Sequence, residues 1–460
     1  MADLSIEFCG VKSPNPFWLA SAPPTNTGAQ IKRAFDAGWG GAVWKTLGNP
    51  IINTSSRFGA VNYGSTRMMG LNNIELITDR PLEVNLREME DVKKHYADHV
   101  VVASLMVDTK EEWHEIVKKV QDAGADMLEL NFGCPHGMCE RGMGSAVGAE
   151  PEVLKTIVGW VMEVAKVPVI IKLTPNVGDI TVPALAALEA GADAVSLINT
   201  VKSIVGVDLD RMIPYPVVGD ASSNGGYCGP AVKPIALHML GQVARVFPKP
   251  ISGIGGISNW RDAAEFMVLG ATSVQVCTAV MHYGYRIVED MIEGLNDFLD
   301  DKGMASAMDL VGKAVPQYKE WGQLDMNYHV VADIDPAKCI GCQLCVVSCM
   351  DGSHQCIHIP GMDDDEKKRR GHVVFPTDVP DIAATAEGAK AGARVPWVHE
   401  EECVGCNLCQ LVCPVEGTIS MREKRKAPES ISWNERVMNG TDVVPGGLDA
   451  TRKARGLDAE

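Results

Sequence analysis

Short apolar runs recur through the first 300 residues of the chain. Each holds six to eight residues and is rich in Val, Ile and Leu, and none alternates apolar with polar positions. The runs are Phe17–Pro23, Gly41–Leu47, Val101–Met106, Met127–Gly133, Val169–Pro175, Ala194–Thr200, Ile251–Gly256 and Ser273–Val280. Unbroken runs of this length are typical of strands that are buried on both faces of a parallel sheet.

Amphipathic stretches with helical spacing separate these runs. The clearest are Lys110–Ala123, Pro151–Ala165, Val182–Ala190 and Trp260–Leu269, with Pro81–Ala97 following an irregular loop from Asn49 to Thr78. Several helices are expected to stop at an Ala-Gly pair (37–38, 123–124 and 190–191), because glycine favours the helix C-terminus. Eight strands, each followed by a helix, predict an α/β fold with a (β/α)8 TIM barrel over residues 1–304.

Eight cysteines near the C-terminus form two runs of identical spacing. The runs are Cys339-x2-Cys342-x2-Cys345-x3-Cys349 and Cys403-x2-Cys406-x2-Cys409-x3-Cys413. This spacing is the signature of a ferredoxin with two [4Fe–4S] clusters, in which the fourth cysteine of each run binds the other run's cluster. Zinc sites use separated C-x2-C pairs, so zinc would leave the third cysteine of each run without a role.

The cysteine runs divide the rest of the chain. We expect a connector over residues 305–329 and a small α+β ferredoxin-like domain over residues 330–421, with a long insertion at 350–402. The insertion carries a charge run over residues 363–370 and an Ala- and Gly-rich stretch, which indicates a solvated excursion. An extended or disordered tail is expected over residues 422–460.

The composition of the chain argues against nucleic-acid-binding, membrane-spanning and secreted proteins. The net charge of −17 argues against nucleic-acid binding, which needs an excess of Lys and Arg. No run of 18 apolar residues is present, and the N-terminal residues do not resemble a signal peptide. The 14 cysteines are therefore interpreted as ligands and free thiols in a reducing cytoplasm.

Polar residues stand where the predicted barrel strands end, which is where barrel enzymes keep their chemistry. In chain order these are Ser21, Lys45, Thr46, Asn131, Cys134, Lys172, Asn199, Thr200, Gly255, Gly256, Cys277 and Thr278. A lysine at one strand end is often only a salt-bridge partner. Two of them beside amides suit a ring that becomes anionic on reduction, such as a flavin.

The glycines near the last strands fall where barrels commonly bind phosphate. They are Gly255 and Gly256, with Gly229 as a further backbone donor. No Gly-x-Gly-x-x-Gly unit follows a predicted strand. The chain thus has a place for FMN but none for a nicotinamide dinucleotide.

Cys134 opens a glycine-rich loop that could close over the barrel mouth. A thiol there suits a general acid that protonates carbon while the flavin reduces the adjacent carbon. A strand-end cysteine can equally be an inert small hydrophobe. Cys9, Cys228, Cys277 and Cys356 are mostly placed in that inert class.

The combined motifs resemble the dihydropyrimidine dehydrogenase family, in particular its bacterial subunit with the pyrimidine site. They are Leu19-Ala-Ser-Ala, Arg33-Ala-Phe-Asp-Ala-Gly-Trp-Gly40, Asn73-Ile-Glu-Leu, Cys134-Pro-His-Gly-Met, Lys172-Leu-Thr-Pro-Asn, Asn199-Thr-Val, Gln275-Val-Cys and the two cysteine runs. The resemblance implies flavin contacts from Ser21, Lys45, Thr46, Asn131, Lys172, Gly229, Gly255, Gly256, Cys277 and Thr278. It implies pyrimidine contacts from Asn73, Asn131, Asn199 and Thr200, and a proton-donating Cys134.

The same resemblance implies an oxidoreductase that interconverts uracil or thymine with the 5,6-dihydro forms. Its FMN would receive electrons from NAD(P)H through two [4Fe–4S] clusters, with a separate FAD- and NAD(P)-binding flavoprotein in a heterotetramer. Gly133 departs from the serine often found in the family. Two alternatives stay open: a dihydroorotate dehydrogenase-like flavoenzyme and a non-catalytic electron-transfer module.

Overall fold

The structure is a computed structural model. It describes residues 2–49, 57–135, 137, 139–324, 328–359, 395–426 and 432–440. The chain divides into two compact units, Met1–Tyr318 and Lys319–Glu460.

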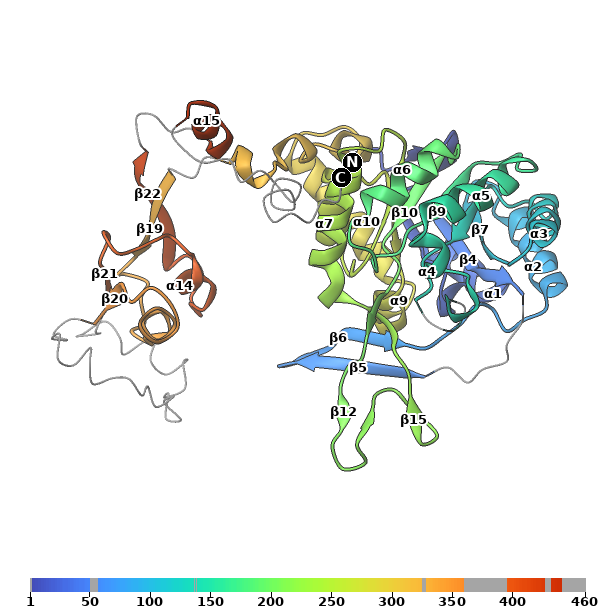
Figure 1. Ribbon diagram of the computed structural model, residues 1–460. Coiled ribbons are helices and arrows are strands. Elements are labelled where there is room, and N and C mark those ends of the chain that lie inside the picture. Colours follow the sequence, from blue (N-terminus) through green and yellow to red (C-terminus); the bar gives the residue numbers. More distant parts are fainter. Residues whose placement is uncertain are drawn as a thin grey trace, which may run out of the picture. The chain divides into compact units, whose positions relative to one another are not determined.

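The first unit is a closed barrel of eight parallel strands, so the predicted TIM barrel is confirmed (Figure 1). Each strand begins within one residue of a predicted run. The strands are β3 (Phe17–Leu19), β4 (Gly41–Gly48), β7 (Val100–Met106), β8 (Met127–Asn131), β9 (Val169–Lys172), β10 (Ala194–Leu197), β17 (Ile251–Ile254) and β18 (Ser273–Val276). Except at β4 and β7, the predicted runs end later than the strands, because they include the first loop residues, which carry polar groups.

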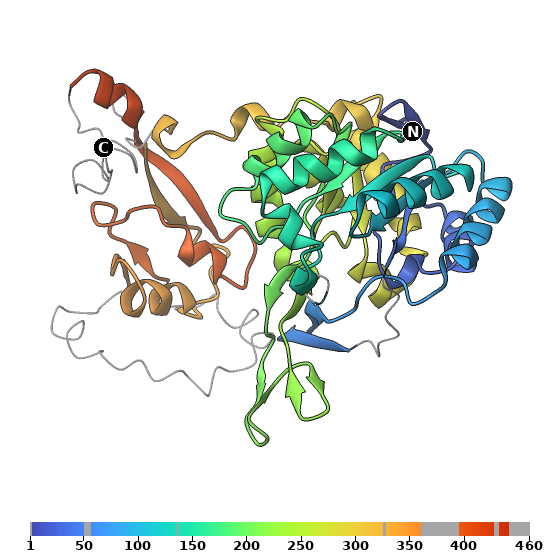
Figure 2. The same ribbon diagram turned by 45° about the vertical axis from the view of Figure 1, so that its right-hand side comes forward.

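Helices surround the barrel in both views (Figures 1 and 2). They are α1 (Gly28–Ala37), α2 (Leu82–His95), α3 (Lys110–Asp122), α5 (Pro151–Met162), α6 (Thr181–Glu189), α7 (Lys233–Ala244), α8 (Trp260–Val268) and α10 (Ile287–Asp301). Local sequence sets their ends. Thr109 and Glu112 form a capping box at the start of α3, and Gly38 ends α1 at φ 114°.

Apolar side chains close one end of the barrel. The hairpin β1 (Ile6–Phe8) and β2 (Val11–Ser13) brings Phe8 against Trp18 at a ring distance of 5.2 Å. Both side chains are fully buried in a cluster with Val43, Val102 and other inward residues. The opposite end, where the strands terminate, is left for a pocket.

The prediction of an irregular loop between Asn49 and Thr78 was wrong for the residues of this segment that the structure describes. It holds β5 (Phe58–Tyr63) and β6 (Thr66–Asn73), which join β16 (Gly225–Cys228) and β11 (Val201–Ser203) in an antiparallel sheet. The strands of this hairpin mix polar, glycine and apolar residues and are half-exposed, so they lack the apolar signal of the barrel strands.

Two further hairpins continue from this sheet and extend away from the barrel (Figures 1 and 2). They are formed by β12 (Val207–Asp208) with β13 (Ile213–Pro214) and by β14 (Val217–Val218) with β15 (Ala221–Ser222).

The barrel unit extends past the expected boundary at residue 304. The backbone N–H groups of Asp3 and Ala307 donate to the carbonyls of Ala305 and Asp3, each at 2.8 Å. Leu310 is buried in the barrel core. Residues 305–318 therefore belong to the first unit, and the rest of the expected connector belongs to the second.

The second unit is built on β19 (Tyr328–Ile334), which pairs antiparallel with β22 (Ile419–Lys426). A smaller pair is formed by β20 (Ile357–His358) and β21 (Trp397–Val398), and β20 lies beside the short helices α11 (Leu344–Val346) and η7 (Val347–Asp351). The helix α14 (Leu408–Leu411) packs against α11, η7 and β22. The expected tail boundary at residue 421 falls inside β22 because pairing with β19 continues, and α15 (Trp433–Met438) follows. Residues 360–394 of the expected insertion lie outside the described residues.

In the parts of the chain that the structure describes, no helix has the length and apolar character needed to cross a membrane.

Candidate active site and cluster cavities

A pocket of about 1140 Å³ opens where the barrel strands end. Its wall includes every residue that the sequence predicted for flavin or substrate contact. These are Ser21, Lys45, Thr46, Asn73, Asn131, Cys134, Lys172, Asn199, Thr200, Gly229, Gly255, Gly256, Cys277 and Thr278. The structure thus brings them together, although they come from separate strands and loops.

Lys45 and Thr46 are neighbours in β4, yet both line the pocket. Consecutive side chains of a regular strand point to opposite faces. The pairing of β4 with β7 is irregular between Trp44 and Leu47, and this irregularity lets both side chains reach the barrel mouth.

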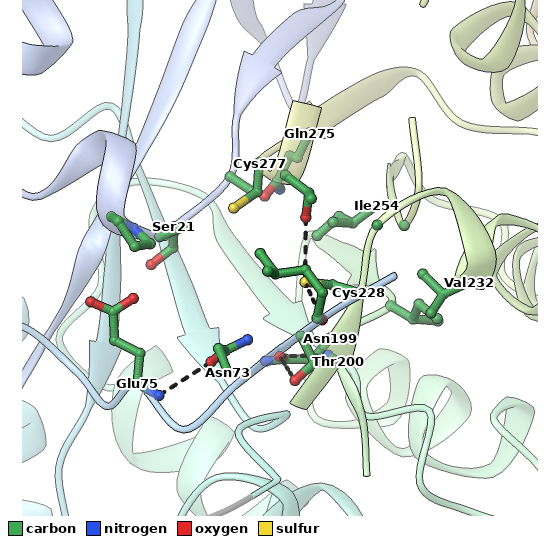
Figure 3. Close-up of a pocket in the computed structure, with 18 of the residues that line it drawn as sticks. Ser21, Asn73, Glu75, Asn199, Thr200, Cys228, Val232, Ile254, Gln275 and Cys277 are labelled. Carbon is green, nitrogen blue, oxygen red and sulfur yellow. Dashed lines mark hydrogen bonds between the residues drawn. The ribbon is translucent and has the colours of Figure 1, made fainter. Parts of the chain in front are cut away.

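Each pocket lysine has a glutamate partner that the sequence-based reasoning did not assign to the site. The Lys45 Nζ atom lies 2.6 Å from Glu75 Oε1, and the Lys172 Nζ atom lies 3.3 Å from Glu129 Oε1. Glu75 follows β6 and lines the pocket beside Asn73 (Figure 3). The lysine charges are therefore balanced within the protein, and an anionic ligand is not needed to keep them buried.

Glu129 is the centre of a buried polar network. Its Oε2 atom accepts hydrogen bonds from Ser196 Oγ at 2.8 Å and from Gln275 Nε2 at 3.0 Å. Its side chain is fully buried, and it points inward because it lies two residues before Asn131 on the same strand. That spacing was the available sequence signal: a glutamate in an apolar strand, two positions before a polar strand end.

The side-chain oxygen of Gln275 tests whether the pocket fits a flavin. Its Oε1 atom is buried and has no hydrogen-bond partner among the described residues, while the residue lines the pocket (Figure 3). A buried acceptor without a donor costs free energy unless a ligand or water supplies one. A flavin ring carries such an N–H donor, so this wall fits FMN.

Amides and hydroxyls form a connected chain across the pocket. Asn131 Nδ2 donates to Thr46 Oγ1, and Asn199 Nδ2 donates to Asn131 Oδ1, each at 3.0 Å. The Thr200 N–H donates to Asn199 Oδ1 at 2.8 Å. Asn73 approaches from β6, where its Nδ2 atom donates to the Gly226 carbonyl at 3.0 Å. These bonds fix amide orientations before any ligand arrives.

Cys134 lies just after β8 and is held by its own loop. The Ser145 N–H donates to the Cys134 carbonyl at 3.0 Å. A Cβ atom at Gly144 would lie 2.8 Å from that carbonyl oxygen, so this close turn requires glycine. The thiol is buried with Ile77 and Met106 and lines the pocket.

Because Gly133 has no side chain, the side chain of Asn199 can pack directly against its backbone. A Cβ atom at position 133 would lie 2.4 Å from the Cβ atom of Asn199 and 2.5 Å from its Nδ2 atom. The serine expected from the family resemblance would not fit against Asn199 as it is placed here.

Two other thiols face the pocket but have different surroundings. Burial raises the pKa of both Cys228 and Cys277, so these thiols stay neutral at physiological pH. Thr278 Oγ1 donates to Cys228 Sγ at 3.3 Å. Neutral, hydrogen-bonded thiols suit contacts with a cofactor better than nucleophilic roles.

Glycines shape one wall of the pocket. Gly229, Gly255 and Gly256 have φ values of 90°, 133° and 77°. A Cβ atom at Gly256 would lie 2.8 Å from the Gly229 carbonyl oxygen and 2.9 Å from the Lys233 backbone nitrogen. Only glycine allows these two backbone segments to meet, and the wall so formed fits a phosphate group.

The second unit contains two cavities of about 330 and 320 Å³, each lined by four of the eight predicted cluster cysteines. The first is lined by Cys339, Cys342, Cys345 and Cys413. The second is lined by Cys349, Cys403, Cys406 and Cys409. These two sets agree with the crossed pairing that the spacing predicts, in which each run gives its fourth cysteine to the other site.

Burial affects the cavity thiols strongly. It raises the pKa of Cys345 to about 12 and that of Cys409 to about 11. Thiols in such surroundings need positive charge nearby to ionise. Within the described residues, no three His, Cys, Asp or Glu side chains converge tightly enough for a single ion. Four thiols around a cavity fit a cluster of several atoms.

Comparison with known proteins agrees with both units. The profile of the dihydroorotate dehydrogenase family matches residues 3–299, and that of the 4Fe-4S dicluster domain matches residues 338–417. The NAD-dependent dihydropyrimidine dehydrogenase subunit PreA of Escherichia coli is 46% identical over 375 residues, which are 80% of this chain and 90% of that protein.

Two further relatives are similar over more than two thirds of this chain. The chloroplastic dihydropyrimidine dehydrogenase (NADP(+)) of Arabidopsis thaliana is 41% identical over 331 residues, covering 69% of this chain and 78% of that protein. The catalytic subunit of dihydroorotate dehydrogenase B (NAD(+)) of Pyrococcus horikoshii is 37% identical over 320 residues, covering 68% of this chain and 98% of that protein.

Proposed function

Because this chain belongs to the dihydroorotate dehydrogenase family and shares 46% identity with a dihydropyrimidine dehydrogenase subunit, we propose that it is the catalytic subunit of a dihydropyrimidine dehydrogenase. It reduces uracil or thymine reversibly to the 5,6-dihydro forms. One observation carries the proposal: Cys134 and a hydrogen-bonded set of carboxamides line the same pocket as a glycine-built phosphate wall.

FMN is the cofactor that the pocket fits. Gly229, Gly255, Gly256 and Thr278 would hold its phosphate, while Lys172 and Gln275 would face the ring. When bound, FMN supplies the electron pair for reduction of the pyrimidine. The protein contributes the fixed dipoles and charges around the ring.

The carboxamides suit the edge of a pyrimidine base. Uracil presents alternating C=O and N–H groups, and each carboxamide offers both a donor and an acceptor. Asn73, Asn131 and Asn199 with Thr200 would bind this edge. Because their mutual hydrogen bonds already fix their orientation, little ordering is needed when the base binds.

Cys134 is the proton donor in this proposal. Its thiol gives a proton to one ring carbon of the base, and the neighbouring carbon receives the electron pair with the second hydrogen. Burial keeps the thiol itself largely out of contact with bulk water. In the reverse direction the Cys134 thiolate takes the proton back.

Electrons would reach this site from a partner subunit. The 460 residues contain no Gly-x-Gly-x-x-Gly unit on a strand–helix turn, while the second unit has two cluster cavities. We therefore propose a FAD- and NAD(P)-binding flavoprotein as partner, in a heterotetramer. A cytoplasmic location is proposed because cluster thiols need reducing surroundings.

Turnover with two substrates tests the proposed function against the dihydroorotate alternative. Orotate carries a carboxylate, and both pocket lysines that could receive it are already paired with glutamates. Uracil reduction should be fast and dihydroorotate oxidation negligible. Efficient turnover of dihydroorotate without uracil reduction would overturn the proposal, and turnover of neither would favour a non-catalytic electron-transfer module.

Anaerobically purified protein should contain one FMN and about eight irons with matching sulfide per chain. The reason is that one pocket has a phosphate wall and that each of two cavities is lined by four of the eight spaced cysteines. Metal, sulfide and flavin analysis checks this. Zinc in place of iron, or about four irons per chain, would contradict it.

Gly256→Val should weaken FMN binding by roughly tenfold or more, since each 1.4 kcal/mol is a factor of ten in affinity. The added side chain would collide with the Gly229 and Lys233 backbones and strain a residue at φ 77°. Fluorescence titration of FMN measures the effect. Gly178→Val is the matched control, because no atom lies within 4 Å of a Cβ atom added at Gly178. Equal FMN affinity in both variants would show that this wall does not bind the FMN phosphate.

A further inference from the structure

The second cluster cavity is lined by five cysteines instead of four. Cys356 joins Cys349, Cys403, Cys406 and Cys409 around it, although it belongs to neither spaced run. It is almost completely buried, with 3% of its surface exposed. From the sequence alone, Cys356 is mostly placed in the class of inert small hydrophobes, which is the usual fate of a lone cysteine.

Cys356 is in direct contact with a predicted ligand. Its Sγ atom lies 3.5 Å from Cys349 Sγ, and its backbone N–H donates to that same sulfur at 3.4 Å. Cys403, a second predicted ligand, lines the same cavity. The Cys356 thiol therefore contacts one ligand sulfur and is part of the wall of the cluster cavity.

The first cavity provides an internal comparison. Its described wall contains Cys339, Cys342, Cys345 and Cys413, and no fifth cysteine. Cys413 occupies there the role that Cys349 has in the second cavity, as the fourth cysteine contributed by the other run. The two sites thus have the same ligand pattern but differ by one thiol.

We propose that Cys356 is a reserve ligand, which binds the iron of the second cluster when Cys349 is unavailable. The inference rests on the proposed cluster sites. In the exchange the iron–sulfur bond of Cys349 breaks and one to Cys356 forms, while the Cys356 thiol proton passes to the departing Cys349 sulfur. The iron keeps its oxidation state and the cluster its charge.

The local structure favours this exchange over a rearrangement of the backbone. The His399 N–H donates to the Cys356 carbonyl at 2.7 Å, which fixes the main chain at the start of β20. Rotation about the Cα–Cβ bond is then the motion that brings the Cys356 sulfur toward the position of Cys349. Such a site lets the second cluster survive oxidation of one ligand.

Iron content of matched variants tests the proposal in the full-length holoprotein. Cys349→Ala should keep about eight irons, whereas Cys413→Ala should keep about four. The double variant Cys349→Ala/Cys356→Ala should fall to about four, and Cys356→Ala alone should keep about eight. Electron paramagnetic resonance of the reduced samples should show two interacting clusters in Cys349→Ala and one in the double variant.

Each outcome has a definite meaning. Loss of four irons in Cys349→Ala, from a wild type that holds eight, would overturn the reserve ligand alone. A wild type without eight irons would overturn the proposed cluster sites instead. If Cys349→Ala does not fold, Cys349→Ser with and without Cys356→Ala makes the same comparison: the proposal requires that removing Cys356 lowers the iron content, and an equal content overturns it.

Discussion

Replacing Cys134 with alanine is expected to lower the rate of uracil reduction by roughly 10²–10⁴-fold, the usual contribution of a positioned general acid. The thiol lines the pocket and lies among apolar side chains, where it can protonate a ring carbon of a bound base. FMN and iron content should stay at wild-type levels, because alanine keeps the backbone carbonyl that accepts the hydrogen bond from the Ser145 N–H. Steady-state rates at saturating uracil measure the effect.

Two variants separate chemistry from packing at this position. Cys134→Ser should keep part of the activity, since a hydroxyl still donates a proton, though less readily. Cys139→Ala is the control within the same loop, because its half-buried thiol donates to the Pro135 carbonyl and lies outside the pocket wall. Near wild-type turnover in Cys134→Ala would show that Cys134 only fills space in the loop and does not donate the proton.

Glu129→Gln is expected to lower the free energy of unfolding of the barrel by about 3–5 kcal/mol, the typical cost of removing one partner from a buried ion pair. The variant keeps the shape of the side chain but leaves the Lys172 ammonium, which is 6% exposed, without its counter-charge. It also gives Ser196 and Gln275 an amide where they had a carboxylate. Urea unfolding followed by tryptophan fluorescence, at matched FMN occupancy, measures the change.

Removing the unpaired Lys172 charge should recover most of the lost free energy of unfolding. The double variant Glu129→Gln/Lys172→Met should be clearly more stable than Glu129→Gln, although its flavin site is altered. Glu75→Gln should cost less than Glu129→Gln, because the Lys45–Glu75 pair is partly exposed to water. A Glu129→Gln variant as stable as the wild type would show that this pair does not support the barrel.

The barrel could be predicted from sequence for a physical reason. Strands covered on both faces need unbroken apolar runs, and such runs stand out against amphipathic helices. Because parallel strands end at one edge of the barrel, polar residues such as Asn131, Lys172 and Thr278 could be assigned to one pocket. The cysteine spacing likewise correctly predicted which of the eight spaced cysteines line the same cavity.

The partners of these residues could not be predicted in the same way. The pairing of Lys172 with Glu129 depends on which faces of two neighbouring strands point inward. Glu75 reaches Lys45 from a hairpin whose half-exposed strands carry little apolar signal. Cys356 meets Cys349 through a turn between the π-helix η7 and β20 that no spacing rule describes.

The central claim is that this chain reduces pyrimidines but obtains its electrons through a partner. The most direct measurement is uracil reduction by the purified, cofactor-loaded chain alone, with either NADH or a low-potential artificial donor such as reduced methyl viologen. We predict dihydrouracil formation with the artificial donor and essentially none with NADH or NADPH. Equal rates with NADH and the artificial donor, or no dihydrouracil with either, would contradict the account.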